Sequence, residues 1–208
     1  MTKQIEARLA QYPALSAIQA ELCAAYDLLC RCYDAGGKLL VCGNGGSAAD
    51  SAHIVGELMK GFLLPRPLSE AETARFAAQE GTEALAKGLQ GALPAIDLTA
   101  HAALLSAVAN DGDADMVFAQ QVWGYAKKED CLLAMSTSGN SRNILNALKT
   151  AAAKGIPSIG ITGANGGAAK ALCSVCICLP ETQTYKVQEL TLPLYHALCA
   201  ALEARYFQ

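Results

Sequence analysis

A serine-rich turn holds the residues of this chain best suited to bind a small anion. Three serines and a threonine fall within six positions, at Ser136, Thr137, Ser138 and Ser141. The turn follows a short apolar run, 131–135, with the length of a buried strand, and a helix-like stretch begins at Arg142. Unpaired N–H groups and the positive end of the helix dipole gather at such a junction, where hydroxyls add donors. The turn therefore predicts a phosphate-type anion site, with a simple capping turn as the alternative.

A glycine-rich turn, 43–47, forms a similar junction earlier in the chain. It follows the apolar run 38–42, ends in Ser47 and precedes a helix-like stretch, 48–60. Glycines let the backbone approach a ligand closely. The Gly-x-Gly-x-x-Gly spacing of dinucleotide sites and the Gly-Lys-Ser/Thr ending of a P-loop are both missing, so neither nucleotide site is predicted.

Polar side chains on two predicted helices form a second group. His53 and Glu57 are four residues apart and share one helix face, so both can meet one ion or one substrate. Gln188 and His196 lie on the last predicted helix, from 185 onward. This set suits Zn²⁺ or a similar divalent ion, or an acid/base pair without metal. The alternative is two structural histidines beside solvent-facing carboxylates.

The spacing of Gln188 and His196 raises a geometric question. Eight residues correspond to about 12 Å along a straight helix. Pro193 lies between them and removes one helical hydrogen bond, which favours a kink. The two side chains can converge through that kink or face one pocket from neighbouring subunits, and the sequence leaves both open.

Five apolar runs alternate with helix-like stretches and short turns. The predicted strands are 38–42, 93–97, 131–135, 157–162 and 175–179. This alternation predicts an α/β fold, a three-layer α-β-α sandwich with a five-stranded parallel sheet of the flavodoxin-like type. Ligands bind such sheets at the carboxyl ends of strands, where strand order reverses, so both serine-containing turns are expected there.

Two helical segments flank this pattern. Apolar positions recur at alternating spacings of three and four across 14–35, which predicts a bundle-type helix that packs on another subunit, so 1–35 is assigned to oligomerisation. The segment 63–92 is predicted to be an insertion of one or two amphipathic helices, with a capping box at Ser69 and Glu72. Residues 110–114 are predicted to form a polar turn.

Composition fits one globular domain spanning 1–208. Hydrophobic residues make up 52% and charged residues 17%, which excludes a disordered chain. A net charge of −3 gives no electrostatic reason to expect nucleic acid as a partner. We expect no membrane partner either, because no apolar run approaches a membrane span and the N-terminus lacks a signal-peptide core. A cytoplasmic protein is expected.

The nine cysteines include a close group at Cys173, Cys176 and Cys178. On the strand predicted there, Cys176 and Cys178 share a face and Cys173 lies outside. No second cysteine pair completes a four-thiolate metal site, so buried structural cysteines are predicted.

The motifs together resemble the sugar isomerase (SIS) domain, and more closely the phosphoheptose isomerases. They are Gly43-Asn-Gly-Gly-Ser47, His53-x-x-x-Glu57, Ser136-Thr-Ser-Gly-Asn-Ser141, and Gln188-Glu189 with His196. Their order covers nearly the whole chain, and their joint occurrence is far more specific than any one motif. The resemblance implies a single SIS domain, assembled as a homotetramer or homodimer with active sites between subunits.

The resemblance also implies a reaction, the interconversion of sedoheptulose 7-phosphate and D-glycero-D-manno-heptose 7-phosphate through an enediol. Glu57 would move the proton between C1 and C2, with His196 as the partner acid/base. The positions matching substrate contacts are Asn44, Gly45, Gly46, Ser47, Asn110, Asp111, Ser136, Thr137, Ser138, Ser141 and Gln188. The positions matching zinc ligands in some family members are His53, Glu57, Gln188 and His196.

Two departures from the family pattern concern the choice of sugar. A second histidine expected after the Gln-Glu pair is Thr191 here, and an arginine expected four residues after Glu57 is Gly61, with Lys60 and Arg66 close by. A non-catalytic SIS protein, either a sugar-phosphate sensor or a scaffold that binds a replication initiator, is the alternative, as is a sugar-phosphate lyase or etherase. The presence of both Glu57 and His196 favours an enzyme.

Overall fold

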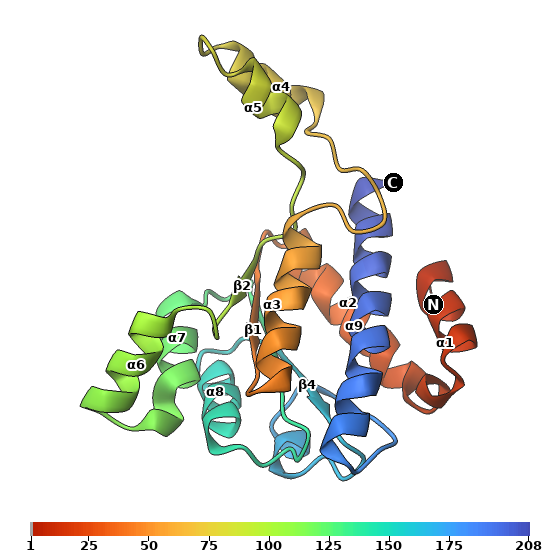
Figure 1. Cartoon of the computed structure of the whole chain (residues 1–208), viewed down its shortest axis with the longest axis vertical. Coiled ribbons are helices and arrows are strands. Elements are labelled where there is room, and N and C mark those ends of the chain that lie inside the picture. The colour runs from red at the N-terminus through yellow and green to blue at the C-terminus, as the bar shows by residue number, and fades with distance from the viewer. Residues whose placement is uncertain (1) are drawn as a thin grey trace.

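Five parallel strands form the centre of the computed structural model, which describes residues 2–208 (Figure 1). They are β1 (Leu39–Cys42), β2 (Ala95–Asp97), β3 (Cys131–Met135), β4 (Ser158–Thr162) and β5 (Val175–Cys178). The order in the sheet is β2-β1-β3-β4-β5, and every pairing is parallel. The predicted fold class is confirmed, and each strand lies within two residues of its predicted bounds.

The central strands are apolar on both faces because helices cover both sides of the sheet. Every residue of β1, β3 and β4 is buried. Successive side chains of a strand point to opposite faces, so Leu39 and Val41 join one apolar core while Leu40 and Cys42 join the other.

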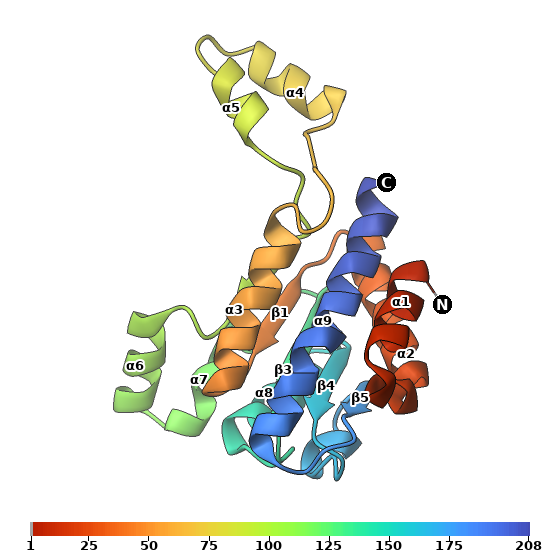
Figure 2. The same ribbon diagram turned by 45° about the vertical axis from the view of Figure 1, so that its right-hand side comes forward.

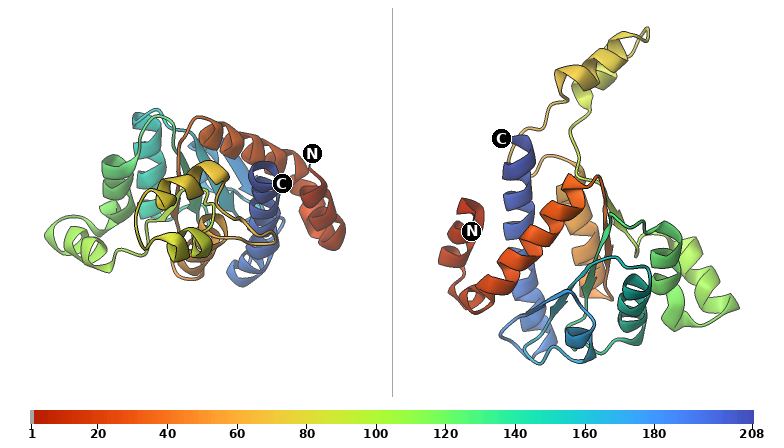
Figure 3. Two further views of the ribbon diagram at one scale, coloured as in Figure 1. Left: turned by 90° about the horizontal axis from the view of Figure 1, so that it is seen from above. Right: turned by 180° about the vertical axis from the view of Figure 1, so that it is seen from behind.

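The helices divide between these two cores (Figures 2 and 3). The first core contains α2 (Gln19–Asp34), α3 (Gly46–Met59) and α9 (Thr184–Phe207), with α1 (Lys3–Gln11) packed on α9. The second core contains α7 (Val117–Tyr125), α8 (Arg142–Ala153) and the short 3-10 helix η3 (Ala168–Ala171). Helix α6 (Ala102–Asp111) and the 3-10 turn η2 (Ala114–Met116) lie at the edge beside α7. Among residues 2–208, none of these helices has the length and apolar character needed to span a bilayer.

The recurring apolar residues of 14–35, here called the N-terminal stripe, differ from their prediction in secondary structure and in packing. Residues Pro13–Ile18 form a 3-10 helix, η1, and α2 starts only at Gln19. The stripe residues Leu15, Leu22 and Leu29 are at most 2% exposed and join the first core. The stripe is therefore buried within this chain, and the expectation that it packs on another subunit is wrong. Whether 1–35 takes part in oligomerisation through other side chains stays a prediction.

An arm, residues 68–89, projects from the body (Figures 1 and 2). It contains α4 (Glu70–Ala77) and α5 (Glu83–Gly88), and none of the described residues of these two helices is buried. The predicted capping box is present, since the Glu72 amide donates to Ser69 and the Ser69 amide donates to Glu72. A single antiparallel bridge between Pro67 and Gln90 closes the base of the arm.

Candidate active site

The strand order reverses between β1 and β3, and both serine-containing turns leave the carboxyl ends of these two strands. A cavity of about 280 Å³ opens between them, here named the anion pocket. Its lining residues are Asn44, Gly45, Gly46, Ser47, Met135, Ser136, Thr137, Ser141, Thr184 and Gln188. Residues separated by nearly a hundred positions therefore meet at the edge where ligands bind such sheets.

Three helices begin at this pocket: α3 at Gly46, α8 at Arg142 and α9 at Thr184. In the described structure, the N-cap residue of none of the three bonds the first N–H groups through its side chain, although in α8 the Asn143 side chain accepts from the Ile144 N–H at 2.9 Å. Each helix start carries roughly half a positive charge, and its free N–H groups can bind an anion. The start of α9, marked by Thr184, is a part of the site that no motif in the sequence indicated.

The hydrogen bonding of Ser141 distinguishes the two interpretations of the serine-rich turn, an anion site or a simple capping turn. It occupies the N-cap position of α8, yet its Oγ lies 3.0 Å from the Oγ of Ser136 instead of accepting a bond from the helix. Ser136, Thr137 and Ser141 all line the pocket. The turn is therefore not a simple cap, and its hydroxyls remain available to a ligand.

Two amides pair beside the pocket, and one predicted serine is not part of its lining. Asn44 and Asn143 exchange two hydrogen bonds of 2.9 Å between their side-chain amides. Asn143 is a second residue that sequence reasoning missed, because only the fold brings it beside the first turn. Ser138 is exposed at the edge of the loop, where its Oγ accepts a bond from the Asn140 N–H at 3.1 Å. Its predicted contact with phosphate stays a prediction.

Two glycines allow this close packing. A Cβ at Gly46 would lie 2.6 Å from the side-chain nitrogen of Gln188, so glycine lets that amide lie against the start of α3. Gly139 has a φ of +66°, and a Cβ there would overlap the Gly166 carbonyl oxygen. Larger residues at either position would change the shape of the pocket.

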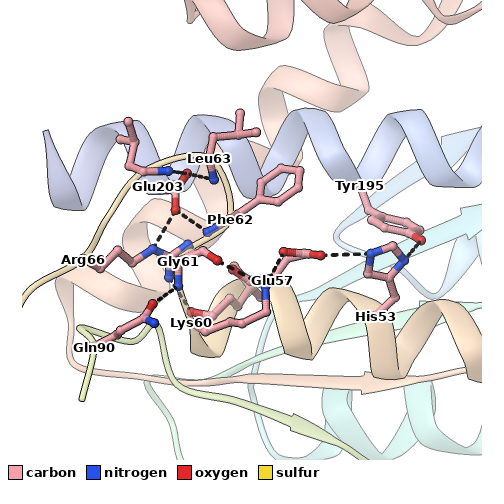
Figure 4. Close-up of polar contacts among 12 residues, drawn as sticks. His53, Glu57, Lys60, Gly61, Phe62, Leu63, Arg66, Gln90, Tyr195 and Glu203 are labelled. Atoms are coloured by element: carbon pink, nitrogen blue, oxygen red, sulfur yellow. Dashed lines mark hydrogen bonds and ion pairs between the residues drawn. The ribbon is translucent and has the colours of Figure 1, made fainter. Parts of the chain in front are cut away.

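The second group of polar residues meets further along α3 and α9 and is here named the acid/base cluster: His53, Glu57, Tyr195 and His196. Figure 4 shows the first three of these residues. His53 Nε2 lies 3.0 Å from Glu57 Oε1, and His53 Nδ1 lies 2.8 Å from the Tyr195 hydroxyl. The consistent arrangement has Tyr195 donating to Nδ1 and Nε2–H donating to Glu57. Lys60 Nζ donates to the other Glu57 oxygen at 3.2 Å.

His196 joins this cluster from α9. Its ring centroid lies 5.1 Å from that of His53 and 5.2 Å from that of Phe62. Its Nε2 is buried and has no hydrogen-bond partner among residues 2–208. Burial lowers the pKa of His196 below its ordinary value, and the nearby charge of His53 adds to the effect. A neutral imidazole with one unpaired nitrogen suits proton transfer or a cation.

A buried ion pair fixes the end of α3 behind Glu57 (Figure 4). Arg66 is 1% exposed, and its Nε donates to Glu203 at 2.8 Å. Its other two nitrogens donate to the carbonyls of Leu58 and Glu57, at 2.7 and 3.0 Å. The sequence showed only that an arginine was nearby. Its partner is 137 positions away, and no local pattern indicates such a pair.

The four candidate metal ligands do not converge within one chain. His53, Glu57 and His196 meet, but Gln188 lies against Gly46 at the anion pocket. Helix α9 runs unbroken through Pro193, so of the two alternatives that the sequence left open, convergence through a kink does not occur within the chain. Across residues 2–208, no group of three or more His, Cys, Asp or Glu side chains is arranged to hold a metal ion.

Asn110 and Asp111 differ in local structure from the predicted polar turn. Both are exposed and form the last two residues of α6, which ends at Gly112. Asn110 Nδ2 donates to the Asp111 carboxylate at 2.8 Å. Both lie outside the lining of the anion pocket, so their predicted contact with substrate is not made at that cavity of a single chain.

The chain belongs to the SIS domain family. One SIS domain model matches residues 84–201 and a second matches residues 3–90. The phosphoheptose isomerase of Rhodospirillum rubrum is 38% identical over 169 residues, which covers 81% of this chain and 77% of that protein. That of a Synechocystis species is 38% identical over 184 residues, covering 88% and 82%. The solved phosphoheptose isomerase GmhA of Neisseria gonorrhoeae is 31% identical, with a TM-score of 0.72 over 92% of this chain and 90% of that one.

Proposed function

We propose that the protein is a sugar-phosphate isomerase that interconverts sedoheptulose 7-phosphate and D-glycero-D-manno-heptose 7-phosphate. The observation that carries this proposal is the anion pocket, where three helix starts without a bond from their N-cap side chain, together with the hydroxyls of Ser47, Ser136, Thr137 and Ser141, suit a phosphate. The carboxylate and imidazole of the acid/base cluster lie on two of the helices that begin there. The names and similarity of the relatives support the seven-carbon substrate.

The proposed reaction needs a base, a partner acid and an anchored phosphate. A proton on the carbon next to a carbonyl is acidic enough for a carboxylate to remove. Glu57 takes the proton from C1 of the ketose and returns it to C2, and His196 exchanges the proton between the two oxygens. The phosphate group, held at the anion pocket, fixes the position of the reacting carbons.

The proposed active site combines two subunits. Gly46, at the pocket, and His53, in the acid/base cluster, are seven residues apart on α3, about 10 Å along the helix. Gln188 and His196 are eight residues apart on α9, a similar separation. The pocket of one chain, completed by Glu57 and His196 of a second copy, would bring the predicted phosphate-binding and proton-transferring residues to one substrate. This proposal requires a homo-oligomer.

We also propose that part of this cluster contributes to a zinc site, although the His, Cys, Asp and Glu side chains of residues 2–208 form no complete metal site in one chain. His53 Nε2 and Glu57 Oε1 are 3.0 Å apart, close to the roughly 3.4 Å expected between two ligand atoms on one tetrahedral Zn²⁺. The Tyr195 hydroxyl at Nδ1 fixes the ring, as outer partners of metal-bound histidines do. The unpaired Nε2 of His196 provides a third ligand, and Gln188 fits only from another subunit. A bound zinc ion would polarise the substrate carbonyl.

The test is to incubate the purified protein with sedoheptulose 7-phosphate in D₂O, with and without added Zn²⁺, and to follow the mixture by NMR. Deuterium at C2 of a new aldose product would establish isomerisation by proton transfer. Binding without product or exchange would overturn the proposal and favour a sensor or scaffold. A product that has lost part of the sugar or its substituent would favour a lyase or etherase.

A further inference from the structure

Three thiols gather where β5 pairs with β4. Cys176 Sγ lies 3.9 Å from Cys178 Sγ. A Cβ built on Gly160 would meet the sulfur atoms of Cys173 and Cys176, at 2.5 and 3.4 Å, so both sulfurs lie over this glycine. Cys173 lies outside β5, as predicted, but the turn after η3 brings its sulfur beside that of Cys176. These residues form a thiol cluster.

The thiols of this cluster are partly exposed, and their pKa values differ. Its three cysteines are half-buried, as is Cys23, whereas the other five cysteines are buried. The neighbouring Cys173 thiol lowers the pKa of Cys176 to about 6, against the opposing effect of burial, with help from Thr162 and Lys170. The same proximity raises the pKa of Cys173. Cys176 is therefore the more acidic thiol of the pair.

We propose that Cys176 and Cys173 are a hydroperoxide-reactive pair that closes into a disulfide. The Cys176 thiolate attacks one oxygen of the peroxide, an S–O bond forms, the O–O bond breaks, and the alkoxide or hydroxide leaves and takes up a proton. The Cys173 thiol then attacks the sulfenic sulfur, an S–S bond forms, and the displaced hydroxide leaves as water with the thiol proton. Two electrons pass from the sulfurs to the peroxide, and a dithiol reverses the change.

Backbone hydrogen bonds connect Cys173 and its surroundings to the serine-rich turn that lines the anion pocket. The Cys173 N–H donates to the Ala169 carbonyl at 3.1 Å, and the Ala169 N–H donates to the Gly139 carbonyl, inside the serine-rich turn, at 3.0 Å. The Gly163 N–H donates to the Thr137 carbonyl at 2.9 Å. Drawing Cys173 onto Cys176 moves η3 and with it this turn. Oxidation is therefore expected to weaken anion binding, a consequence that rests on the proposed phosphate role of the pocket.

The first experiment maps the disulfide without reference to activity. Fully reduced protein is exposed to limiting hydrogen peroxide, alkylated after unfolding and analysed by peptide mass spectrometry. We expect a Cys173–Cys176 disulfide within one chain, formed about tenfold faster than any oxidation of Cys23. In Cys173→Ser, a dimedone adduct is expected on Cys176, while Cys23→Ser should behave as the wild type. Oxidation of Cys23 at the same rate, or no adduct on Cys176, would overturn the proposal.

The second experiment measures the affinity for inorganic phosphate in the reduced, oxidised and dithiothreitol-treated protein. Affinity about tenfold lower after oxidation, restored by the dithiol and unchanged by peroxide in Cys173→Ser, is expected for two coupled sites. Equal phosphate affinity in all three forms would refute the proposed coupling between the thiol cluster and the serine-rich turn. Phosphate binding does not require isomerase activity, so failure here is distinguishable from failure of the proposed reaction.

Discussion

Gln188 and His196 lie on the same helix, yet their side chains lie at two different sites in the molecule. The Gln188 amide lies against Gly46 at the anion pocket, and the His196 ring lies 5.1 Å from the His53 ring. Because α3 and α9 run side by side in the same direction, the substrate-holding and proton-transferring groups follow one another along both helices (Figures 1 and 2). This separation is the strongest structural reason to place the complete site between two copies.

Mixing two variants, one impaired in turnover and one in phosphate binding, tests that placement. Glu57→Gln removes the proposed base, and Ser141→Ala weakens the pocket. If each site takes its pocket from one chain and its base from another, random assembly leaves about a quarter of the sites with both wild-type parts. A fraction of sites with wild-type affinity and turnover should therefore appear when the two variants are co-assembled and purified through two different tags. A mixed oligomer whose activity at low substrate equals the average of the two variants, with no such sites, would place the whole site within one chain.

Glu57→Gln alone should lower turnover about 10³-fold and leave the affinity for the sugar phosphate largely intact, because an amide keeps the shape but cannot take up the proton. The measurement is single-turnover kinetics together with calorimetric binding. Glu70→Gln, which removes an exposed carboxylate from the arm, serves as the control and should retain activity. Unchanged turnover in Glu57→Gln would discard this residue as the base.

Ser141→Ala should weaken binding of the sugar phosphate about tenfold and barely affect the same sugar without phosphate. The Ser141 hydroxyl lines the pocket, and a hydrogen bond to a charged group contributes roughly 1.5–3 kcal/mol. Ser106→Ala is the matched control, since its hydroxyl bonds only to the Ala103 carbonyl on α6. An equal loss for both sugars would contradict the phosphate assignment.

Inorganic phosphate should stabilise the protein against heat. Three helix starts of like partial charge face one cavity, and a bound anion relieves their repulsion. At a hundred times its Kd, a ligand adds about 2.7 kcal/mol, which raises Tm by roughly 5–10 °C in a chain of this size. A thermal shift assay with phosphate, and with chloride at equal ionic strength, measures the effect. Identical shifts with both salts would argue against a specific site.

The buried Glu203 should make the stability of the body depend on pH. Burial acts to raise its pKa, but the N–H groups of Phe62 and Leu63 and the Arg66 guanidinium outweigh it and hold the pKa below the ordinary 4.5. The ionised form therefore stabilises the fold fully above pH 4.5, and this contribution is lost as pH falls through the lower, folded-state value.

Glu203→Gln is accordingly expected to cost about 3 kcal/mol at neutral pH and to flatten the loss of stability in acid. The measurement is urea unfolding at a series of pH values. Glu83→Gln, which removes an exposed carboxylate in the arm, is the control. A pH dependence as steep in Glu203→Gln as in the wild type would assign the acid sensitivity to other groups.

Most of the fold could be predicted from the sequence because its elements are local. The run 131–135 is buried at every position, as a strand covered on both faces must be, and its turn meets the other glycine-rich turn because the strand order places them together. Arg66 and Glu203 could not be paired, since their contact depends on the final packing of α3 against α9. Proline at 193 suggested a kink, but Pro193 is buried and the surrounding contacts keep α9 continuous.

The arm has a practical consequence for anyone who modifies this protein. Pro67 and Gln90 already pair at its base, so the connection between α3 and β2 is closed before the arm begins. Residues added to the arm beyond that pair therefore do not change the register of the β-sheet. The loop between α4 and α5, around the exposed Gly81, is therefore a natural insertion point for an affinity tag, a fluorescent protein or a surface-attachment handle, because the arm projects from the body and the anion pocket lies at the opposite end of α3 (Figure 1).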